Sequence, residues 1–187
     1  MKVLLLNGSR REKGCTYTAL SEIAQTLEKQ GIQAEIIHAV PETKIIKSVA
    51  EKVKTADGLV VGSPVYWASP SGEIISFMDR LSSLAGKDLL HKPAAAIASA
   101  RRAGTTATLD VLAKYFTYHQ MPVVSANYWN VVHGNTPDEV KKDAEGMQIM
   151  RVLGNNMAWL LKCIEAGKNN GVQIPETEAK IMTNFIR

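Results

Sequence analysis

The residues best suited to chemistry lie near the amino terminus, in a polar stretch of glycines, hydroxyls and cations that spans residues 7–16. This stretch follows a short apolar run, residues 3–6, and precedes a segment whose apolar side chains recur with helical spacing. Where a buried strand leads through a glycine-containing loop into a helix, free backbone N–H groups and the positive end of the helix dipole attract anions. The stretch therefore predicts a phosphate-binding loop. Its candidate ligands are Ser9, Arg11, Gly14, Cys15, Thr16 and Thr18.

Two common phosphate-binding loops do not match this spacing. A nucleoside-triphosphate loop has one residue fewer between its glycines and then a lysine, whereas five residues separate Gly8 from Gly14 and Cys15 follows. A dinucleotide fingerprint requires glycine at the position that Arg10 holds. The remaining pattern, Gly-Ser-x-Arg-x-x-Gly-x-Thr, suits a single terminal phosphate held without magnesium by hydroxyls and backbone amides. An ordinary charged turn between strand and helix is the alternative.

Two further loops carry unusual side chains. After an expected strand at residues 58–62, two prolines stiffen a segment that holds two large aromatic rings. The candidate ligands there are Pro64, Val65, Tyr66, Trp67 and Ala68. Another expected strand, residues 92–99, ends in a cationic turn with the candidates Ser99, Arg101, Arg102 and Gly104. The alternatives are an aromatic plug over the core and a pair of solvated arginines.

These loops resemble those of the flavodoxin-like NAD(P)H-dependent FMN reductases, whose first loop commonly reads Gly-Ser-Pro-Arg-x-x-Gly-Asn/Ser-Thr. Four positions match: Ser9, Arg11, Gly14 and Thr16. Arg10 and Cys15 depart from the pattern. Residues 63–80 are similar to the family's second signature, Thr/Ser-Pro-Ile/Val-Tyr-x-Gly/Ala-Ser. The iron-sulfur flavoproteins of the same superfamily need a cysteine cluster, which Cys15 and Cys163 do not supply.

The resemblance implies an enzyme with bound FMN, which NADPH or NADH reduces and a small acceptor such as free flavin, a quinone or a nitro compound reoxidises. It implies no catalytic side chain, because hydride transfer depends on stacking geometry and on a tuned flavin. The cationic turn would favour the reduced flavin or the 2′-phosphate of NADPH. A flavodoxin-like electron carrier without its own substrate site is the alternative, although such carriers are usually acidic. A homodimer or homotetramer is expected.

Apolar periodicity assigns the elements that must position these loops. Strands are expected at residues 3–6, 34–38, 58–62, 92–99 and 121–126, with helices between them. A last long helix is expected from the capping box at Thr136 and Pro137 to about residue 163. This alternation predicts an α/β fold: a flavodoxin-like, doubly wound, five-stranded parallel sheet in the order 2-1-3-4-5 with helices on both faces. That order brings the three polar loops together at the carboxyl ends of the strands.

The composition favours a single domain over residues 1–187, in which residues 167–187, including Ile186, form an apolar tail that docks on the body or on a partner subunit. The formal charge of +4 comes from scattered cations without interleaved aromatic residues, which favours a small anionic ligand over nucleic acid. The two cysteines are too far apart in the sequence to indicate a metal site, and a reducing cytoplasm is expected. Neither a signal peptide nor a membrane span is expected.

Overall fold

A computed structural model describes residues 1–183 and 185, and a parallel sheet forms its centre. The strands are β1 (Lys2–Asn7), β2 (Gln33–His38), β3 (Gly58–Tyr66), β4 (Ser69–Pro70), β5 (Ala94–Ala100) and β6 (Val131–His133). The helices are α1 (Cys15–Lys29), α2 (Thr43–Thr55), α3 (Gly72–Leu89), α4 (Thr105–Tyr118), α5 (Pro137–Lys142) and α6 (Ala144–Asn169). The strand order β2-β1-β3-β5-β6, parallel throughout, confirms the predicted fold class and order, and β4 adds a short antiparallel pairing with β3.

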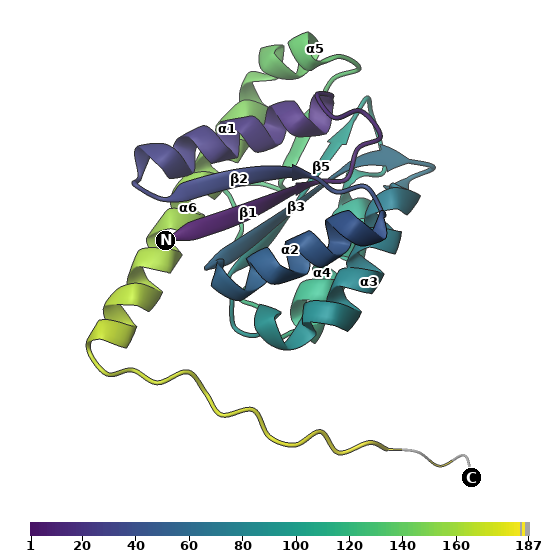
Figure 1. Ribbon diagram of the computed structural model, residues 1–187. Helices are drawn as coiled ribbons and strands as arrows, with labels where there is room; N and C mark the ends of the chain where they lie inside the picture. Colours follow the sequence, from purple (N-terminus) through teal and green to yellow (C-terminus); the bar gives the residue numbers. More distant parts are fainter. Residues whose placement is uncertain (184, 186–187) are drawn as a thin grey trace.

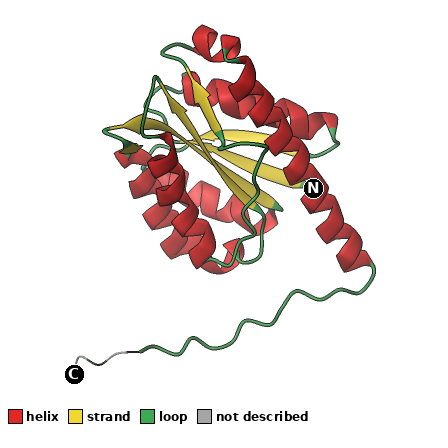
Figure 2. Cartoon of the chain, turned by 180° about the vertical axis from the view of Figure 1, so that it is seen from behind, coloured by secondary structure: helices red, strands yellow, loops and turns green. Residues whose placement is uncertain are grey.

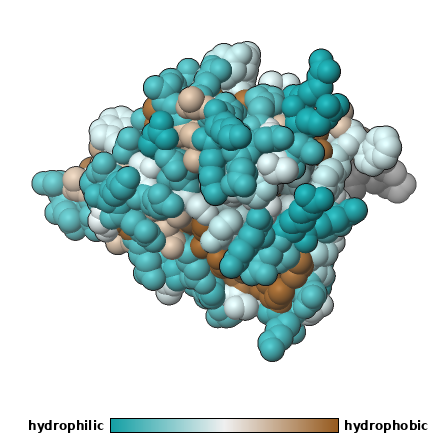
Figure 3. Space-filling view, turned by 90° about the horizontal axis from the view of Figure 1, so that it is seen from above, coloured by the Kyte–Doolittle hydropathy of each residue, from teal (hydrophilic) through white to brown (hydrophobic). Residues whose placement is uncertain are grey.

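Helices cover both faces of the sheet (Figures 1 and 2). One layer contains α1 and α6, which pack against each other, and the other contains α2, α3 and α4. Successive side chains of β1 alternate between these layers: Leu4 and Leu6 join one apolar cluster, whereas Val3 and Leu5 join the other. The short apolar run at the amino terminus is thus a strand buried on both faces. Seen from above, the outer surface is mostly hydrophilic (Figure 3).

The predicted fifth strand at residues 121–126 is wrong over most of its length. Within that segment Val123 pairs with β5 through an isolated bridge to Ala94, and the strand beside the carboxyl half of β5 is β6. Pro122 has no N–H with which to extend a ladder. Between the two pieces, the Nδ2 group of Asn130 donates to a carbonyl of β5 at 3.0 Å. Two separate pieces of chain therefore fill the fifth position of the sheet.

The third strand is longer than predicted. β3 passes through residues expected as a loop and reaches Tyr66, where a two-residue turn at Trp67 and Ala68 reverses the chain into β4. β1 ends beside Gly62, so the last residues of β3 extend beyond it. The aromatic segment therefore forms a β-hairpin at the carboxyl edge of the sheet.

The capping box predicted at Thr136 is present, because Thr136 Oγ1 accepts the N–H of Glu139 at 3.2 Å. The single long helix expected there is divided into α5 and α6. Asp143 leaves helical geometry (φ −73°, ψ 82°), and its carboxylate caps α6 by accepting the N–H of Gly146 at 2.9 Å. Across residues 1–183 and 185, every helix is too short or too polar to span a lipid bilayer.

Beyond α6 the chain continues as an extended tail that leaves the body (Figure 1). Helix α6 reaches Asn169, so the tail begins later than residue 167. Its exposed apolar side chains are Val172, Ile174, Ile181, Met182 and Phe185. Lys180 contacts α4, where its Nζ donates to the Tyr118 hydroxyl at 3.2 Å. Docking of the tail on the body or on a partner stays a prediction, and Ile186 lies outside the described residues.

Candidate functional site

The carboxyl ends of β1, β3 and β5 and the loop after β6 enclose a pocket of about 220 Å³. Residues singled out in the sequence provide most of its lining: Ser9, Arg11, Cys15, Thr16, Pro64, Val65, Tyr66, Ser99 and Arg101. Ala100, Gly134 and Asn135, which were not among the predicted ligands, complete the lining. Among the described residues, two lining side chains are guanidinium groups and none is a carboxylate. The pocket is therefore chemically suited to an anion.

The loop between β1 and α1 is held by Asn7, which was not among the residues predicted from the sequence. Its side chain is buried, with 1% exposed. Oδ1 accepts the N–H of Ser9 at 3.2 Å, and Nδ2 donates to the Glu12 carbonyl at 2.8 Å. Ser9 Oγ in turn accepts the N–H of Arg11 at 3.1 Å. These bonds give the loop a defined conformation, as side-chain turns of asparagine and serine do. The sequence feature that could have identified Asn7 is its place directly after an apolar strand.

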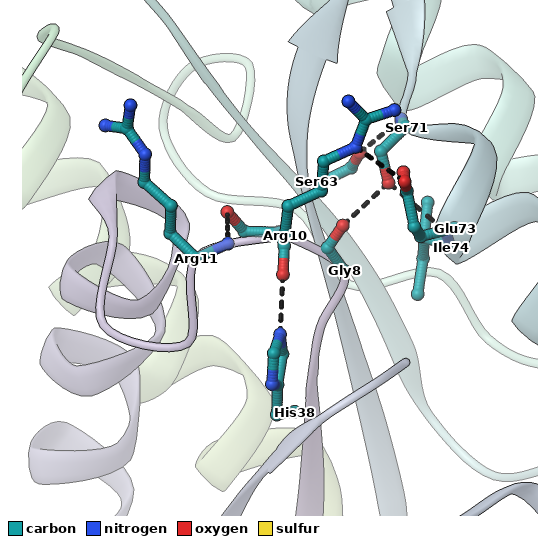
Figure 4. A network of polar contacts seen from close by, with 9 residues as sticks. Gly8, Arg10, Arg11, His38, Ser63, Ser71, Glu73 and Ile74 are labelled. Carbon is teal, nitrogen blue, oxygen red and sulfur yellow. Dashed lines mark hydrogen bonds and ion pairs between the residues drawn. The ribbon is translucent and has the colours of Figure 1, made fainter. Parts of the chain in front are cut away.

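The start of the same loop is attached to β3 and α3 (Figure 4). The N–H of Gly8 donates to the Gly62 carbonyl at 2.8 Å, and the Gly8 carbonyl accepts a hydrogen bond from Ser71 Oγ at 2.6 Å. Ser71 Oγ also caps α3 by accepting the N–H of Ile74 at 3.2 Å. A Cβ at Gly8 would lie 2.5 Å from the Ile74 Cβ, so the close approach of loop and helix requires glycine.

Helix α1 begins directly after this loop, and its first turn has neither a capping side chain nor an acidic residue. The N–H groups of that turn have no intrahelical acceptor, which makes them available to an anion. Thr16 is buried in the turn, and its Oγ1 lies 2.8 Å from Ser99 Oγ at the end of β5. This hydrogen bond joins the first and third of the predicted loops.

Cys15 also lies in the first turn of α1, with its Sγ 3.7 Å from the Gly134 carbonyl oxygen. Burial raises the pKa of the Cys15 thiol and outweighs the opposing effects of its own backbone N–H and of Arg11. The side chain is therefore a neutral thiol rather than a thiolate nucleophile.

The two adjacent arginines of the first loop point in different directions (Figure 4). Arg10 pairs with Glu73 through Nε at 2.6 Å, and its guanidinium lies 5.3 Å from the centroid of the Tyr66 ring. Burial acts to raise the pKa of Glu73, but its backbone hydrogen bond and Arg10 hold that pKa below the ordinary value. Arg11 lines the pocket and pairs with no carboxylate within residues 1–183 and 185. Arg11 is therefore free to bind an anion there.

Six of the predicted ligands do not line the pocket: Gly14, Thr18, Trp67, Ala68, Arg102 and Gly104. Gly14 is the N-cap of α1, and its carbonyl accepts Thr18 Oγ1 at 3.2 Å, so both shape the start of the helix. Trp67 is fully exposed on the hairpin. Gly104 packs beneath that hairpin turn, with Arg102 exposed beside it. Direct contact of these six with a cofactor stays a prediction.

The chain's cysteines lie apart, Cys15 on α1 and Cys163 on α6, and both are free thiols. In the described part of the chain, no three potential ligands among His, Cys, Asp and Glu gather at one place. An iron-sulfur cluster held by four thiolates needs more cysteines than the two that the sequence contains.

Residues 1–136 match the family of NADPH-dependent FMN reductases. The chain belongs to this family. It is therefore a flavoprotein with the family's cofactors, FMN and NAD(P)H, and its chemistry is FMN-dependent oxidoreduction. An iron-sulfur flavoprotein of Methanocaldococcus jannaschii is 29% identical to this reductase-family chain, with 88% of this chain and 100% of the relative covered. An NADPH azoreductase of a Bacillus species is 30% identical over 54% of this chain and 59% of the relative.

A solved structure supports the fold of this family member. The WrbA-like flavodoxin of Agrobacterium tumefaciens superimposes with a TM-score of 0.68 at 16% identity, over 87% of this chain and 97% of that protein. At this level of identity the likeness concerns the fold alone. It agrees with the parallel sheet and its flanking helices.

The pocket fits the phosphate end of FMN. The open first turn of α1, the Arg11 guanidinium and the Ser9 hydroxyl are donors suited to a dianion, and no lining carboxylate opposes them. Pro64, Val65 and Tyr66 add an apolar and aromatic wall to the same pocket, which suits a flavin.

Proposed function

We propose that this protein is an NAD(P)H-dependent oxidoreductase that holds FMN at the carboxyl edge of the sheet and passes electrons to a small acceptor. One observation carries the proposal: a single pocket combines the open amino terminus of α1, the unpaired guanidinium of Arg11 and the aromatic wall of Tyr66. Free flavin, a quinone or a nitro compound is the proposed acceptor. The relative named an NADPH azoreductase supports an acceptor of this small, conjugated kind.

When bound, FMN supplies a group that takes hydride from nicotinamide and releases two electrons to an acceptor. The protein's own residues bind this cofactor and orient it. Arg11 and the first N–H groups of α1 hold the phosphate through charge-assisted hydrogen bonds. Thr16 and Ser99 hold two of the loops together through their 2.8 Å hydrogen bond. Pro64 and Tyr66 exclude water from one wall, and no lining side chain is needed as an acid or a base.

The test is a visible absorption spectrum of the protein after incubation with FMN and desalting, recorded before and after anaerobic addition of NADPH. We expect retained flavin bands that bleach with NADPH. Bands that persist until dithionite is added would favour the flavodoxin-like electron carrier. Loss of all flavin on desalting would contradict FMN binding at this site.

We propose further that the protein forms a homodimer or homotetramer. Large aromatic side chains that do not line the pocket are exposed, which supports an interface between copies. Tyr128 and Trp129 pack edge to face with ring centroids 4.7 Å apart, and Trp159 is exposed on α6. Multi-angle light scattering of the FMN-loaded protein tests this proposal, and a monomer would contradict it.

A further inference from the structure

The turn between β3 and β4 holds an aromatic side chain that the pocket does not use. Trp67 is 100% exposed, and both Trp67 (φ 53°) and Ala68 (φ 57°) lie in the left-handed region. In that region the Cβ atom crowds the following carbonyl, so non-glycine residues rarely adopt it. A two-residue hairpin turn with this geometry requires positive φ at both central positions, where Asn, Asp or Gly is usual. Trp67 and Ala68 therefore hold a conformation that neither residue type favours, and such strain tends to accompany function.

The loop after β5 lies against this turn. A Cβ at Gly104 would lie 2.6 Å from the Cα of Ala68 and 2.8 Å from Cγ1 of Val65. The loop therefore packs its backbone directly on the hairpin. Because Arg101 and Arg102 precede Gly104 in this loop, the packing brings their chain segment to the same rim as the indole of Trp67.

The charges of this rim are unbalanced. Arg101 lines the pocket and Arg102 is exposed next to it. Neither forms an ion pair within residues 1–183 and 185, whereas Arg10, which lies over the Tyr66 ring, is neutralised by Glu73. The pocket itself contains no carboxylate. The rim thus offers a flat aromatic surface together with two free guanidinium groups.

We propose that this rim is the subsite for the electron acceptor and that it selects flat aromatic acceptors with a negative charge, such as sulfonated quinones. The indole of Trp67 stacks on the acceptor ring, and Arg101 and Arg102 bind its anionic group. This inference rests on the proposed function, which supplies NADPH as reductant. A C–H bond of the nicotinamide breaks and two electrons leave with one proton as hydride. The quinone gains two electrons, that proton and a second proton from solvent, and two O–H bonds form.

The test compares NADPH oxidation with 1,4-naphthoquinone-2-sulfonate and with neutral 1,4-naphthoquinone. In the FMN-loaded protein, Trp67→Ala lowers kcat/KM for both quinones by about fivefold, because both quinone rings stack on the indole of Trp67. Arg102→Ala lowers kcat/KM for the sulfonate by about fivefold, leaves the neutral quinone within about twofold, and flattens the salt dependence. The control Lys29→Ala, Lys168→Ala removes two cations from the last turns of α1 and α6 and leaves the ratio between the quinones unchanged.

Trp67→Phe restores most of the lost kcat/KM, because the ring remains, and circular dichroism shows that each variant is folded. The FMN dissociation constant and the rate of bleaching by NADPH stay at their original values in the Trp67 and Arg102 variants, which shows that the loss arises at the acceptor step. An unchanged preference for the sulfonate in the arginine variant, or full activity of Trp67→Ala, would overturn the acceptor subsite alone. A wild-type protein that fails to bleach with NADPH would overturn the proposed function and the subsite with it.

Discussion

The two ends of the sheet carry cavities of different chemistry. At the amino end, a cavity of about 700 Å³ lies between α6, the tail and the segments that precede the strands, whereas the carboxyl pocket encloses about 220 Å³. The larger cavity has mixed charges, with Asp57 and Glu165 beside Lys92 and Lys168. The smaller pocket has two arginines and no carboxylate. Unbalanced charge and converging donors, rather than volume, support the proposal that the carboxyl pocket holds the anionic cofactor.

Both ends also contain non-glycine residues with positive φ, but for different reasons. At the amino end, His91 (φ 62°) and Gln120 (φ 54°) follow the last turns of α3 and α4, where a left-handed residue commonly ends a helix. At the carboxyl end, Trp67 and Ala68 form the two-residue turn of a β-hairpin, which requires positive φ at both positions, and Gly104 packs on that turn. Helix termination explains the first pair, whereas the geometry of a two-residue hairpin turn explains the second.

The largest expected effect is that of Gly104→Ala. Gly104 has φ +91° and its Cβ would lie 2.6 Å from Ala68, so we expect the free energy of unfolding to fall by ~2–5 kcal/mol through strain and overpacking. Gly31→Ala at the amino end is the matched control, because Gly31 has φ +77° with open space around its Cβ position. It should cost only ~1–2 kcal/mol. Urea unfolding followed by circular dichroism measures both, and equal losses would contradict close packing at the rim.

Arg11→Ala should have the next largest effect, on cofactor affinity. Loss of a charge-assisted contact to the phosphate weakens FMN binding by ~1.5–3 kcal/mol, roughly ten- to a hundredfold. Lys168→Ala removes one cation from the larger cavity and should leave the FMN dissociation constant within about twofold. Flavin fluorescence titration measures both constants. A larger loss of FMN affinity in the Lys168 variant than in the Arg11 variant would contradict FMN binding in the carboxyl pocket and would favour the cavity at the amino end of the sheet.

Ala68→Gly should stabilise the protein by ~1 kcal/mol, because glycine adopts the left-handed conformation without strain. The control Ala107→Gly lies at an exposed position inside α4 and should destabilise the protein by ~1 kcal/mol. Thermal and urea unfolding measure both changes. Destabilisation in both variants would show that the hairpin turn is not strained.

The smallest expected effect concerns acid stability at the carboxyl end. The pKa of Glu73 in the folded protein lies below its ordinary value of 4.5, so its charged form stabilises the fold above that pH. This contribution is lost as the pH falls below 4.5 through the lowered pKa. Glu73→Gln should therefore be slightly less stable than the wild type at pH 7, with a difference that disappears in acid. Urea midpoints between pH 7 and pH 3 measure this, and a constant difference would contradict it.

Local patterns predicted much of the fold and of the site. The apolar run of β1 and the periodic face of α1 were predictable because each is coded within a few neighbouring residues. The same holds for the capping box at Thr136. Most of the side chains that line the pocket were also predictable, because the carboxyl ends of parallel strands meet at one edge.

Only the tertiary structure decided the details that depend on partners far away in the sequence. The break between Val123 and β6 depends on the unpaired edge of β5 and on Asn130, which fills the gap. The opposite directions of Arg10 and Arg11 depend on Glu73, which lies more than sixty residues further along the chain. The position of the hairpin turn at Ala68 depends on its contact with Gly104 in another loop. The sequence by itself determined the elements and the chemistry of their ends, because those follow from local periodicity. Long-range packing alone decided which side chain faces the pocket.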